Sequence, residues 1–534
     1  MRKVALYANS IRYLKWEQLW HQATKRIGLD CPLVRTYKPT FNTEMLRLPP
    51  AITELDYDLE FLGRFSVDEL MHNEITLLHS TESVDLDGTW FFGNRSPLWN
   101  HNLHYFEYLF ALAKQYETTN KQEYIEKIKK YISSWIKNNP LGIKNSAWEC
   151  YPIALRLPNW IELYSILHEE IDQDNRFKDQ FIRSLFEQYS YLLNHLEKHL
   201  LANHYFEDLK AIIITSVFFG DDKVRAIATE KLVEQCHEQI FEDGMQYERS
   251  PMYQKILLED LIRVEVALEC VNQKNEIVRR YIKKMLDVAY SLEIGLDRLP
   301  LFNDCGRNIT KSLNALVEAC KKRFGIQPEK GYSFPDSGFY AFEFGEGWKL
   351  IVDGGQPGPD YSPGHAHSEM MSFELFYKGK PIIVNCGTYA YQCNQRMLFK
   401  STQASNTVKI SGTEQSECWS SFRMARRARL CEVKLMENGI ILQMIDYQGH
   451  NIRRTISIQK DCIEVVDESR GENIESFVHF AKNEDCNRIV VSKGQKESFQ
   501  IPYAEEFGVQ EIIQAIKIHD ENSISYKIVI KEMH

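Results

Sequence analysis

The spacing of apolar residues changes from a helical period to a strand period near residue 330, which constrains the fold more than any other feature. From about 101 to 325 apolar residues recur at i, i+3 and i+4, as in residues 124–136, with no strand pattern between the helical segments. From about 335 to 500 short alternating runs are separated by Gly, Asn and Asp turns; examples are 339–344, 348–352, 381–384, 406–410 and 439–445. A helical pattern returns only at about 505–515. The sequence therefore predicts a helical part followed by an antiparallel β part.

A chain of 534 residues is too long for one ordinary core, so several domains are expected. Residues 1–95 form a lead-in, with one amphipathic helix around 11–27 and then a proline-containing irregular stretch. Residues 96–328 form the helical domain, and residues 329–534 the antiparallel β domain. Loops of both domains can enclose a cleft, a common place for a binding site.

Charge and composition narrow the class of protein. The net charge of −10 argues against general nucleic-acid binding. The 12 cysteines show no CxxC spacing, which favours reduced thiols. The N-terminus lacks the apolar run and small-residue cleavage site of a signal peptide, and the most apolar stretch, 211–220, is about half a membrane span. A cytoplasmic protein without a transmembrane segment is expected, with its oligomeric state left open.

Two histidines, His365 and His367, follow a Gly/Pro-rich loop at 354–364 and precede a predicted strand. In an extended segment residues i and i+2 point to the same side. Two imidazoles on one side of a loop suggest catalysis or metal binding. The alternative is a pair of exposed loop histidines.

Two predicted helix starts also carry polar side chains. Asn203 suits an N-cap, although capping does not explain the adjacent His204. Ser250 and Pro251 suit the start of another helix, which places Tyr253 in its first turn. There the helix dipole favours phenolate character. The alternative for Tyr253 is a packed ring with a hydrated hydroxyl.

An arginine-rich segment lies at 422–430 and contains Arg423, Arg426, Arg427 and Arg429. Arginines on a strand can form a solvated face, or they can bind carboxylates and sulfates through bidentate contacts. Asp304 and Asp353 lie in turn-like settings and receive no role. The sequence has no Walker motif, dinucleotide fingerprint or HExxH motif.

Six segments in a fixed order carry a family resemblance; they are 99–106, 202–205, 243–253, 364–367, 381–389 and 401–408. Together they resemble the heparinase II/III family of polysaccharide lyases, over about residues 99–429. The resemblance implies an α+β multidomain fold, an incomplete (α/α) toroid followed by an antiparallel β-sandwich domain. That architecture agrees with the change of period near residue 330.

The resemblance also implies β-elimination at a uronic acid. Its catalytic roles fall on Asn203, Tyr253 and His365, with His204 assisting. Residues in or near these segments are further expected to bind the substrate; they are Tyr205, Glu248, Arg249, Arg423 and Arg427. Elimination removes the C5 proton beside the uronate carboxylate, so Asn203 and a histidine would stabilise the enolate-like state. Tyr253 would be the base, its pKa lowered from about 10 by nearby positive charge.

The chain departs from the family at a metal site. Many relatives bind a divalent metal through the second histidine of the GHxH motif, an aspartate and another histidine. The corresponding residues here are His367, Asn385 and Ser405, and zinc prefers imidazole, thiolate or carboxylate. We therefore expect no tightly bound zinc and no cofactor, and a hydrogen-bonded His367. Gln254 stands where relatives often carry a further histidine.

Three functions remain open. The first is a lyase acting on an anionic, uronic-acid-containing polysaccharide, in exopolysaccharide or capsule metabolism. The second is a catalytically impaired polysaccharide-binding or assembly protein of the same fold. The lost metal ligands favour this second function. The missing signal peptide favours it too, because lyases of this kind usually act outside the cytoplasm. The third is a glycoside hydrolase, which needs two carboxylates flanking the bond; Glu207, Glu248 and Glu369 are the candidates.

Overall fold

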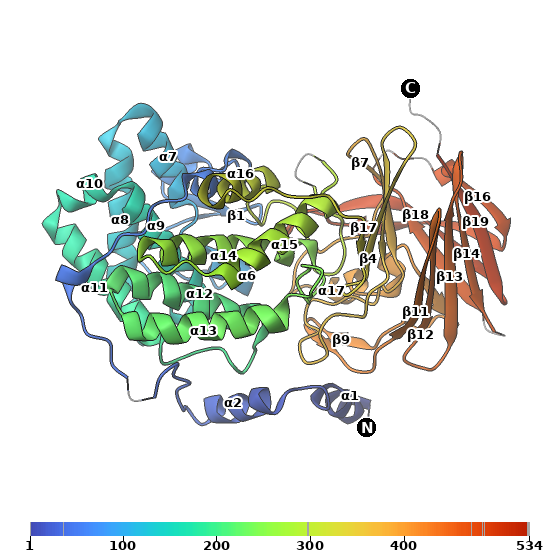
Figure 1. The fold of residues 1–534 in the computed structure, drawn as a ribbon, viewed down its shortest axis with the longest axis horizontal. Coiled ribbons are helices and arrows are strands. Elements are labelled where there is room, and N and C mark those ends of the chain that lie inside the picture. Colours follow the sequence, from blue (N-terminus) through green and yellow to red (C-terminus); the bar gives the residue numbers. More distant parts are fainter. Residues whose placement is uncertain are drawn as a thin grey trace.

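The computed structural model describes residues 2–35, 37–295, 298–470, 473–482, 484 and 486–530. Helices fill one half of the molecule and β-sheets the other (Figure 1). The last long helix, α16, ends at Phe324, and the first strand of the second half, β3, begins at Ser333. The predicted change from helix to strand near residue 330 is thus confirmed, although the predicted β domain includes residues 531–534, which lie outside the described residues.

The helical half is built around α12, which packs against α9, α13 and α14. Every residue of α12 except His204 is buried. From Ala211 to Phe219 the helix is mostly apolar, and the buried Glu207 and Lys210 before it form an ion pair. The helices of this half are α6 (Pro97–Leu103), α7 (Leu109–Thr119), α8 (Gln122–Asn138), α9 (Cys150–Ile166), α10 (His168–Asp172), α11 (Asn175–Leu192), α12 (Ala202–Phe219), α13 (Asp222–Gln239), α14 (Pro251–Cys270), α15 (Glu276–Leu292) and α16 (Leu313–Phe324). No helix among the described residues is long and apolar enough to cross a membrane.

The lead-in before α6 is less irregular than predicted. It contains the short helices α3 (Thr53–Asp56), α4 (Leu59–Leu62) and α5 (Val67–Met71) and a hairpin of β1 (Glu74–Leu77) and β2 (Ser80–Ser83). Apolar residues of these elements, such as Ile52, Leu55 and Ile75, join the core of the helical half. This part of the lead-in therefore folds as part of the helical half.

The described residues of the second half form three larger sheets and a small two-stranded sheet. The five-stranded sheet has the order β3 (Ser333–Phe334), β4 (Phe339–Phe344), β5 (Trp348–Asp353), β6 (Phe373–Tyr377), β7 (Lys380–Ile383), and the six-stranded sheet has the order β11 (Arg429–Met436), β12 (Gly439–Ile445), β13 (Asn451–Ile458), β14 (Cys462–Ser469), β19 (Ser523–Val529), β16 (Ile489–Lys493). The four-stranded sheet has the order β17 (Gln495–Tyr503), β18 (Glu511–Asp520), β15 (Ile474–His479), β8 (Val408–Ile410). The small sheet pairs β10 (Arg423–Met424) with β9 (Cys418–Ser420). All pairings between these described strands are antiparallel, as predicted.

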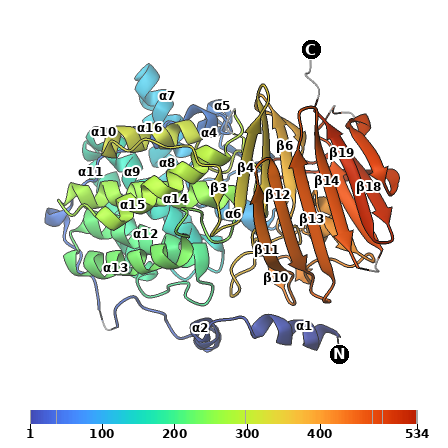
Figure 2. The ribbon, with the colours of Figure 1, turned by 45° about the vertical axis from the view of Figure 1, so that its right-hand side comes forward.

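The five-stranded sheet joins the two halves. On one face, Phe339, Ile351 and Phe376 pack against helical residues that include Leu292. The other face, which includes Leu350, packs against the six-stranded sheet. Because side chains along a strand point alternately to the two faces of the sheet, both faces of this sheet form apolar interfaces. Figure 2 shows the sheet between the helices and the outer strands.

Two predicted helices differ from the structure. The single N-terminal helix predicted around 11–27 is instead two helices, α1 (Arg2–Ile11) and α2 (Trp16–Arg26). Lys15 is extended between them, and its backbone N–H donates to the Gln18 side chain, which starts a new helix. The helix predicted at 505–515 is wrong, because β18 pairs there with β15 and β17 and buries Ile513 and Ala515 while Ile512 stays exposed.

The arginine-rich segment is not one strand. β10 contains only Arg423 and Met424, β11 begins at Arg429, and residues 425–428 between them are irregular. Ala425 and Ala428 are buried in this stretch. The four arginines therefore do not form one continuous row.

Candidate active site

A cavity of about 630 Å³ lies where the N-terminal ends of α12 and α14 meet loops of the β half. The four predicted catalytic residues all line it: Asn203, His204, Tyr253 and His365. Arg423 and Arg427 also line it. Six residues singled out from separate sequence segments are thus brought to one cavity.

Asn203 does not cap α12. The helix begins at Ala202 with Leu201 at the N-cap, in a positive-φ conformation (60°), and Asn203 lies one residue inside the helix. Its side chain lines the cavity and has no hydrogen-bond partner among the described residues. The capping explanation is therefore wrong, and the amide is free to bind a ligand.

His204 is held by a carboxylate. Its Nδ1 lies 2.9 Å from Glu197 Oε2, and its ring lies 4.7 Å from the Tyr151 ring, centroid to centroid. Burial lowers the pKa of His204, but the Glu197 charge outweighs this effect, so that the pKa is raised above the ordinary 6.5. The Glu197 carboxylate therefore favours the protonated form of His204, a residue that lines the cavity.

Tyr253 lies in the first turn of α14, as predicted. Ser250 caps this helix by accepting from the Tyr253 N–H, and Pro251 begins it. The Tyr253 hydroxyl lies 3.1 Å from the Tyr391 hydroxyl. Burial, followed by the nearby Tyr391, raises the pKa of Tyr253 well above 10, contrary to the expected lowering.

The His365 ring lies against the Tyr253 ring, tilted by 37°, with their centroids 4.3 Å apart. Its Nδ1 lies 2.9 Å from Asp304 Oδ2, and its Nε2 lies 3.6 Å from Glu248 Oε2. The Asp304 N–H also donates to the His365 carbonyl, at 3.0 Å. Asp304 therefore fixes both the ring and the backbone of His365.

Asp304 is the centre of a buried network. Arg396 donates through Nη2 to Asp304 Oδ2 at 2.6 Å and through Nη1 to Oδ1, a bidentate ion pair. His367 Nε2 lies 2.9 Å from Oδ1, and Thr388 donates to the same oxygen at 3.2 Å. Burial raises the pKa of Asp304, but Arg396 and the two histidines outweigh it and hold the pKa well below 3.8.

Comparison with known proteins decides the family. The heparinase II/III N-terminus model matches residues 73–330, and the heparinase II/III-like C-terminal model matches residues 326–506. The chain belongs to the heparinase II/III family. Its fold is that of a helical toroid followed by a sheet-rich domain, as predicted.

Individual heparinase II/III relatives are distant in sequence. A heparin-sulfate lyase of Pedobacter heparinus is 21% identical over 428 residues, which cover 72% of this chain and 62% of that protein. The chain thus spans about three fifths of the length of this relative. The crystal structure of heparinase III superimposes with a TM-score of 0.71 at 16% identity, covering 94% of this chain and 88% of that one. A Streptomyces coelicolor chondroitin AC lyase gives 0.51 at 9% identity, covering 95% and 82%.

The residues that were expected to mark a lost metal site, His367, Asn385 and Ser405, do not fit a metal. His367 Nε2 is engaged by Asp304, so the expected hydrogen bond is present. Asn385 accepts from the Asn406 N–H at 2.9 Å, and Ser405 donates to Glu369 at 3.0 Å. Among the described residues no group of three His, Cys, Asp or Glu side chains could hold an ion. A buried guanidinium, Arg396, instead supplies positive charge beside His367.

Three predicted substrate-binding residues lie outside the cavity lining. Tyr205 is buried in the core of the helical half. Glu248 is buried behind His365. Arg249 donates to the Ser337 carbonyl at 2.9 Å and packs on Phe241, which ties the two halves together.

The hydrolase candidates are not placed as a pair across the cavity. Glu207 lines the cavity, but it is ion-paired with Lys210, and burial raises its pKa to about 8. Glu248 and Glu369 are outside the lining. This arrangement does not support two carboxylates flanking a glycosidic bond.

Sequence reasoning missed the residues that support the site: Glu197, Tyr391 and Arg396, together with the role of Asp304. Asp304 and Arg396 are 92 residues apart, and nothing in their local sequence pairs them. Glu197 is seven residues before His204, in a turn that the sequence did not single out. The available sequence signal was a histidine, His204, beside a predicted helix start.

The N-terminal helices complete the cavity wall. Ser10, Ile11, Leu14, Gln18 and Gln22 line it. The Arg423 guanidinium lies 5.6 Å from the Tyr7 ring centroid, and that of Arg427 lies 4.0 Å from the Tyr13 ring centroid. Both predicted substrate-binding arginines are therefore packed against this N-terminal segment.

Proposed function

We propose that the protein is a polysaccharide lyase that cleaves a uronic-acid-containing polysaccharide by β-elimination. The observation that carries the proposal is the convergence of a free amide (Asn203), a carboxylate-held imidazole (His204), a buried tyrosine (Tyr253) and a second histidine (His365) on one cavity. Two relatives named as heparin-sulfate lyases support it.

The binding of the uronate falls to Asn203 and His204. The Asn203 amide and the His204 imidazolium donate hydrogen bonds to the substrate carboxylate. As the C5 proton leaves, negative charge spreads into that carboxylate, and these donors then bind more strongly than they do in the ground state. The interaction lowers the barrier because it is strongest when the charge has developed.

The proton transfers fall to Tyr253. Its phenolate takes the C5 proton, the electron pair of that bond forms the C4–C5 double bond, and the C4–O bond to the leaving sugar breaks. Tyr253 then returns a proton to the departing oxygen, with Tyr391 as its hydrogen-bond partner. Burial keeps Tyr253 protonated in the free protein, so the reaction requires the substrate and His365 to favour the phenolate. The reaction rate should therefore rise with pH.

A panel of polysaccharides tests the proposal. Purified protein should produce the ultraviolet absorbance of unsaturated uronates from at least one uronate polymer and none from a neutral glucan. Binding should weaken with added salt, since contacts to exposed charges are screened over about 8–10 Å. Binding of uronate polymers without any cleavage would instead favour the catalytically impaired alternative, and equal affinity for the glucan would contradict both.

The Glu197–His204 pair predicts a defined pH dependence. Because the pKa of His204 is raised in the folded protein, protonation of His204 stabilises the fold, and this stabilisation is complete when the pH is below 6.5, the ordinary pKa of histidine. The stabilisation is lost as the pH rises through the raised pKa. Burial raises the pKa of Glu197, but the effect of His204 is larger and the pKa is lowered. The Glu197 carboxylate therefore stabilises the fold at pH values above 4.5, the ordinary pKa of glutamate. Glu197→Gln should therefore destabilise the protein most between pH 4.5 and 6.5.

The same substitution should weaken substrate binding at neutral pH. With the Glu197 charge removed, His204 loses its proton at lower pH, and KM should rise by up to about tenfold for each unit by which its pKa falls below the pH of the assay. Thermal melts and KM across pH measure both effects. Glu497→Gln, at a remote exposed pair with His519, is the control and should change neither. A Glu197→Gln variant with an unchanged KM profile would remove His204 from the binding role.

A further inference from the structure

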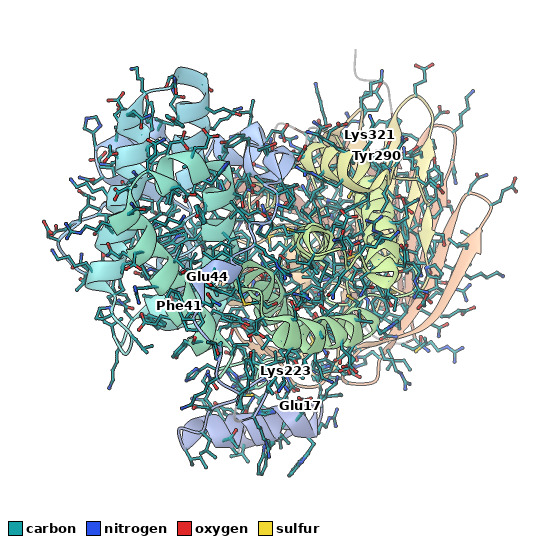
Figure 3. The ribbon with its side chains drawn as sticks, turned by 60° about the vertical axis from the view of Figure 1, so that its left-hand side comes forward. Glu17, Phe41, Glu44, Lys223, Tyr290 and Lys321 are labelled. Carbon is teal, nitrogen blue, oxygen red and sulfur yellow. The ribbon has the colours of Figure 1, made fainter. Side chains whose placement is uncertain are left out.

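The N-terminal strap, which we define as residues 3–27, exposes large apolar side chains on its outward face. Val4 of α1 is 72% accessible, and Trp16 and Trp20 of α2 are 77% and 56% accessible. Tyr7 and Ile11 are partly exposed but contact the protein, Tyr7 at Trp419 and Ile11 at the cavity wall. Figure 3 shows α2, on which Glu17 is labelled, below the body of the helical half with side chains pointing away from it. A surface helix normally points such residues toward the core.

The inward side of the strap is partly polar. Gln18 is buried and lines the cavity together with Ser10 and Gln22, beside the apolar Ile11 and Leu14. The strap thus turns polar side chains inward while both of its tryptophans stay exposed. Contact with the protein accounts for the inward side, but it does not account for the exposure of Val4, Trp16 and Trp20.

The strap is fixed in this orientation by contacts with both halves of the molecule. Gln18 donates to the carbonyls of Leu200, at 3.1 Å, and Tyr361, at 3.3 Å, which lie in different halves. Trp419 of the β half donates to Ser10 Oγ at 3.0 Å, and its ring lies 4.8 Å from the Tyr7 ring. Figures 1 and 2 both show α1 and α2 running along one side of the molecule. The outward face is therefore a defined surface of the folded protein.

The charge of this segment is opposite to that of the protein. Residues 1–30 contain six lysines and arginines and two acidic residues, whereas the whole chain has a net charge of −10. Lys3, Arg12, Lys25 and Arg26 are exposed, although Lys25 also contacts His199 and Arg12 donates to the Tyr13 hydroxyl. Exposed tryptophans, aliphatic residues and basic side chains on consecutive helices are typical of segments that lie in the interface of an anionic bilayer.

We propose that the outward face of the strap binds the surface of an anionic lipid bilayer. Trp16 and Trp20 enter the headgroup region, and the basic side chains pair with lipid phosphates. The helices lie in the interface and do not cross it. Because the inner side of the same strap lines the cavity, the cavity is held beside the membrane. The proposal goes beyond the lyase activity and does not depend on it.

Cosedimentation of the full chain with vesicles tests the proposal. Vesicles of phosphatidylcholine with phosphatidylglycerol should bind the protein at least tenfold more tightly than phosphatidylcholine alone, and added salt should weaken that binding. The double variant Trp16→Ser, Trp20→Ser should lose at least tenfold in affinity. The control Val490→Ser, Ile512→Ser removes two similarly exposed apolar side chains from the β half and should bind as the parent does.

A second variant tests the proposal even if the tryptophan variant fails to fold. Lys3→Glu, Arg26→Glu keeps the apolar face and should also lose anionic-vesicle binding, while its melting temperature stays that of the parent. Failure to bind either kind of vesicle, or equal binding by the parent and both strap variants, would overturn the proposal. So would a parent dimer that binds no vesicles and becomes monomeric in the tryptophan variant, because a second copy would then cover this face.

Discussion

Tyr253→Phe is expected to lower kcat by about 10²–10⁴-fold, the usual contribution of a positioned acid–base group. The hydroxyl is the only group lost, and the ring keeps its contact with His365, 4.3 Å away between centroids. KM should change little, because in the proposed mechanism the uronate carboxylate is bound by Asn203 and His204. Initial rates from the absorbance of the unsaturated product, over a range of substrate concentrations, separate the two constants.

Tyr205→Phe is the matched control. Tyr205 is a buried tyrosine whose hydroxyl has no hydrogen-bond partner among the described residues, and it lies outside the cavity lining. Its loss should leave kcat unchanged. Tyr391→Phe removes the hydroxyl 3.1 Å from that of Tyr253 and should have an intermediate effect. A Tyr253→Phe variant that cleaves as fast as the parent would exclude Tyr253 as the base.

The overall fold could be predicted because its signal is periodic and local. The i, i+3/i+4 pattern before residue 325 and the alternation after 335 are each repeated many times. The helix predicted at 505–515 failed because its apolar residues fit either period, and pairing with β15 and β17 decided for a strand. The break between α1 and α2 lies at residues 12–15, where the Lys15 N–H donates to the Gln18 side chain, within an otherwise continuous apolar pattern.

The candidate site was only partly predictable. Asn203, His204, Tyr253 and His365 come from short segments that carry the family resemblance, and the structure brings them to one cavity. Asp304 and Arg396 meet only through the fold, and no local pattern marks either. The expected lowering of the Tyr253 pKa was wrong because the sequence does not report burial, which is the largest influence on this phenol.

The supporting network gives the largest expected effect on stability. Asp304→Asn should lower the free energy of unfolding by about 3–5 kcal/mol, because it leaves the buried Arg396 guanidinium without its counter-charge. Asp353→Asn is the control. Asp353 is also a buried carboxyl, but burial raises its pKa to about 7, so an amide replaces a group whose charged form is already disfavoured. Denaturant unfolding of both variants should show a large loss only at Asp304.

A double-mutant cycle separates the ion pair from other effects of the substitution. Arg396→Met alone leaves the Asp304 carboxylate buried without its guanidinium, and it should cost about as much as Asp304→Asn. The double variant should be less destabilised than the sum of the two single variants, by a coupling energy of about 0.5–3 kcal/mol. Additive losses would show that the guanidinium is not what stabilises Asp304. Because Asp304 also holds His365 Nδ1 at 2.9 Å, Asp304→Asn should lower kcat under conditions in which the variant remains folded, whereas Asp353→Asn should not.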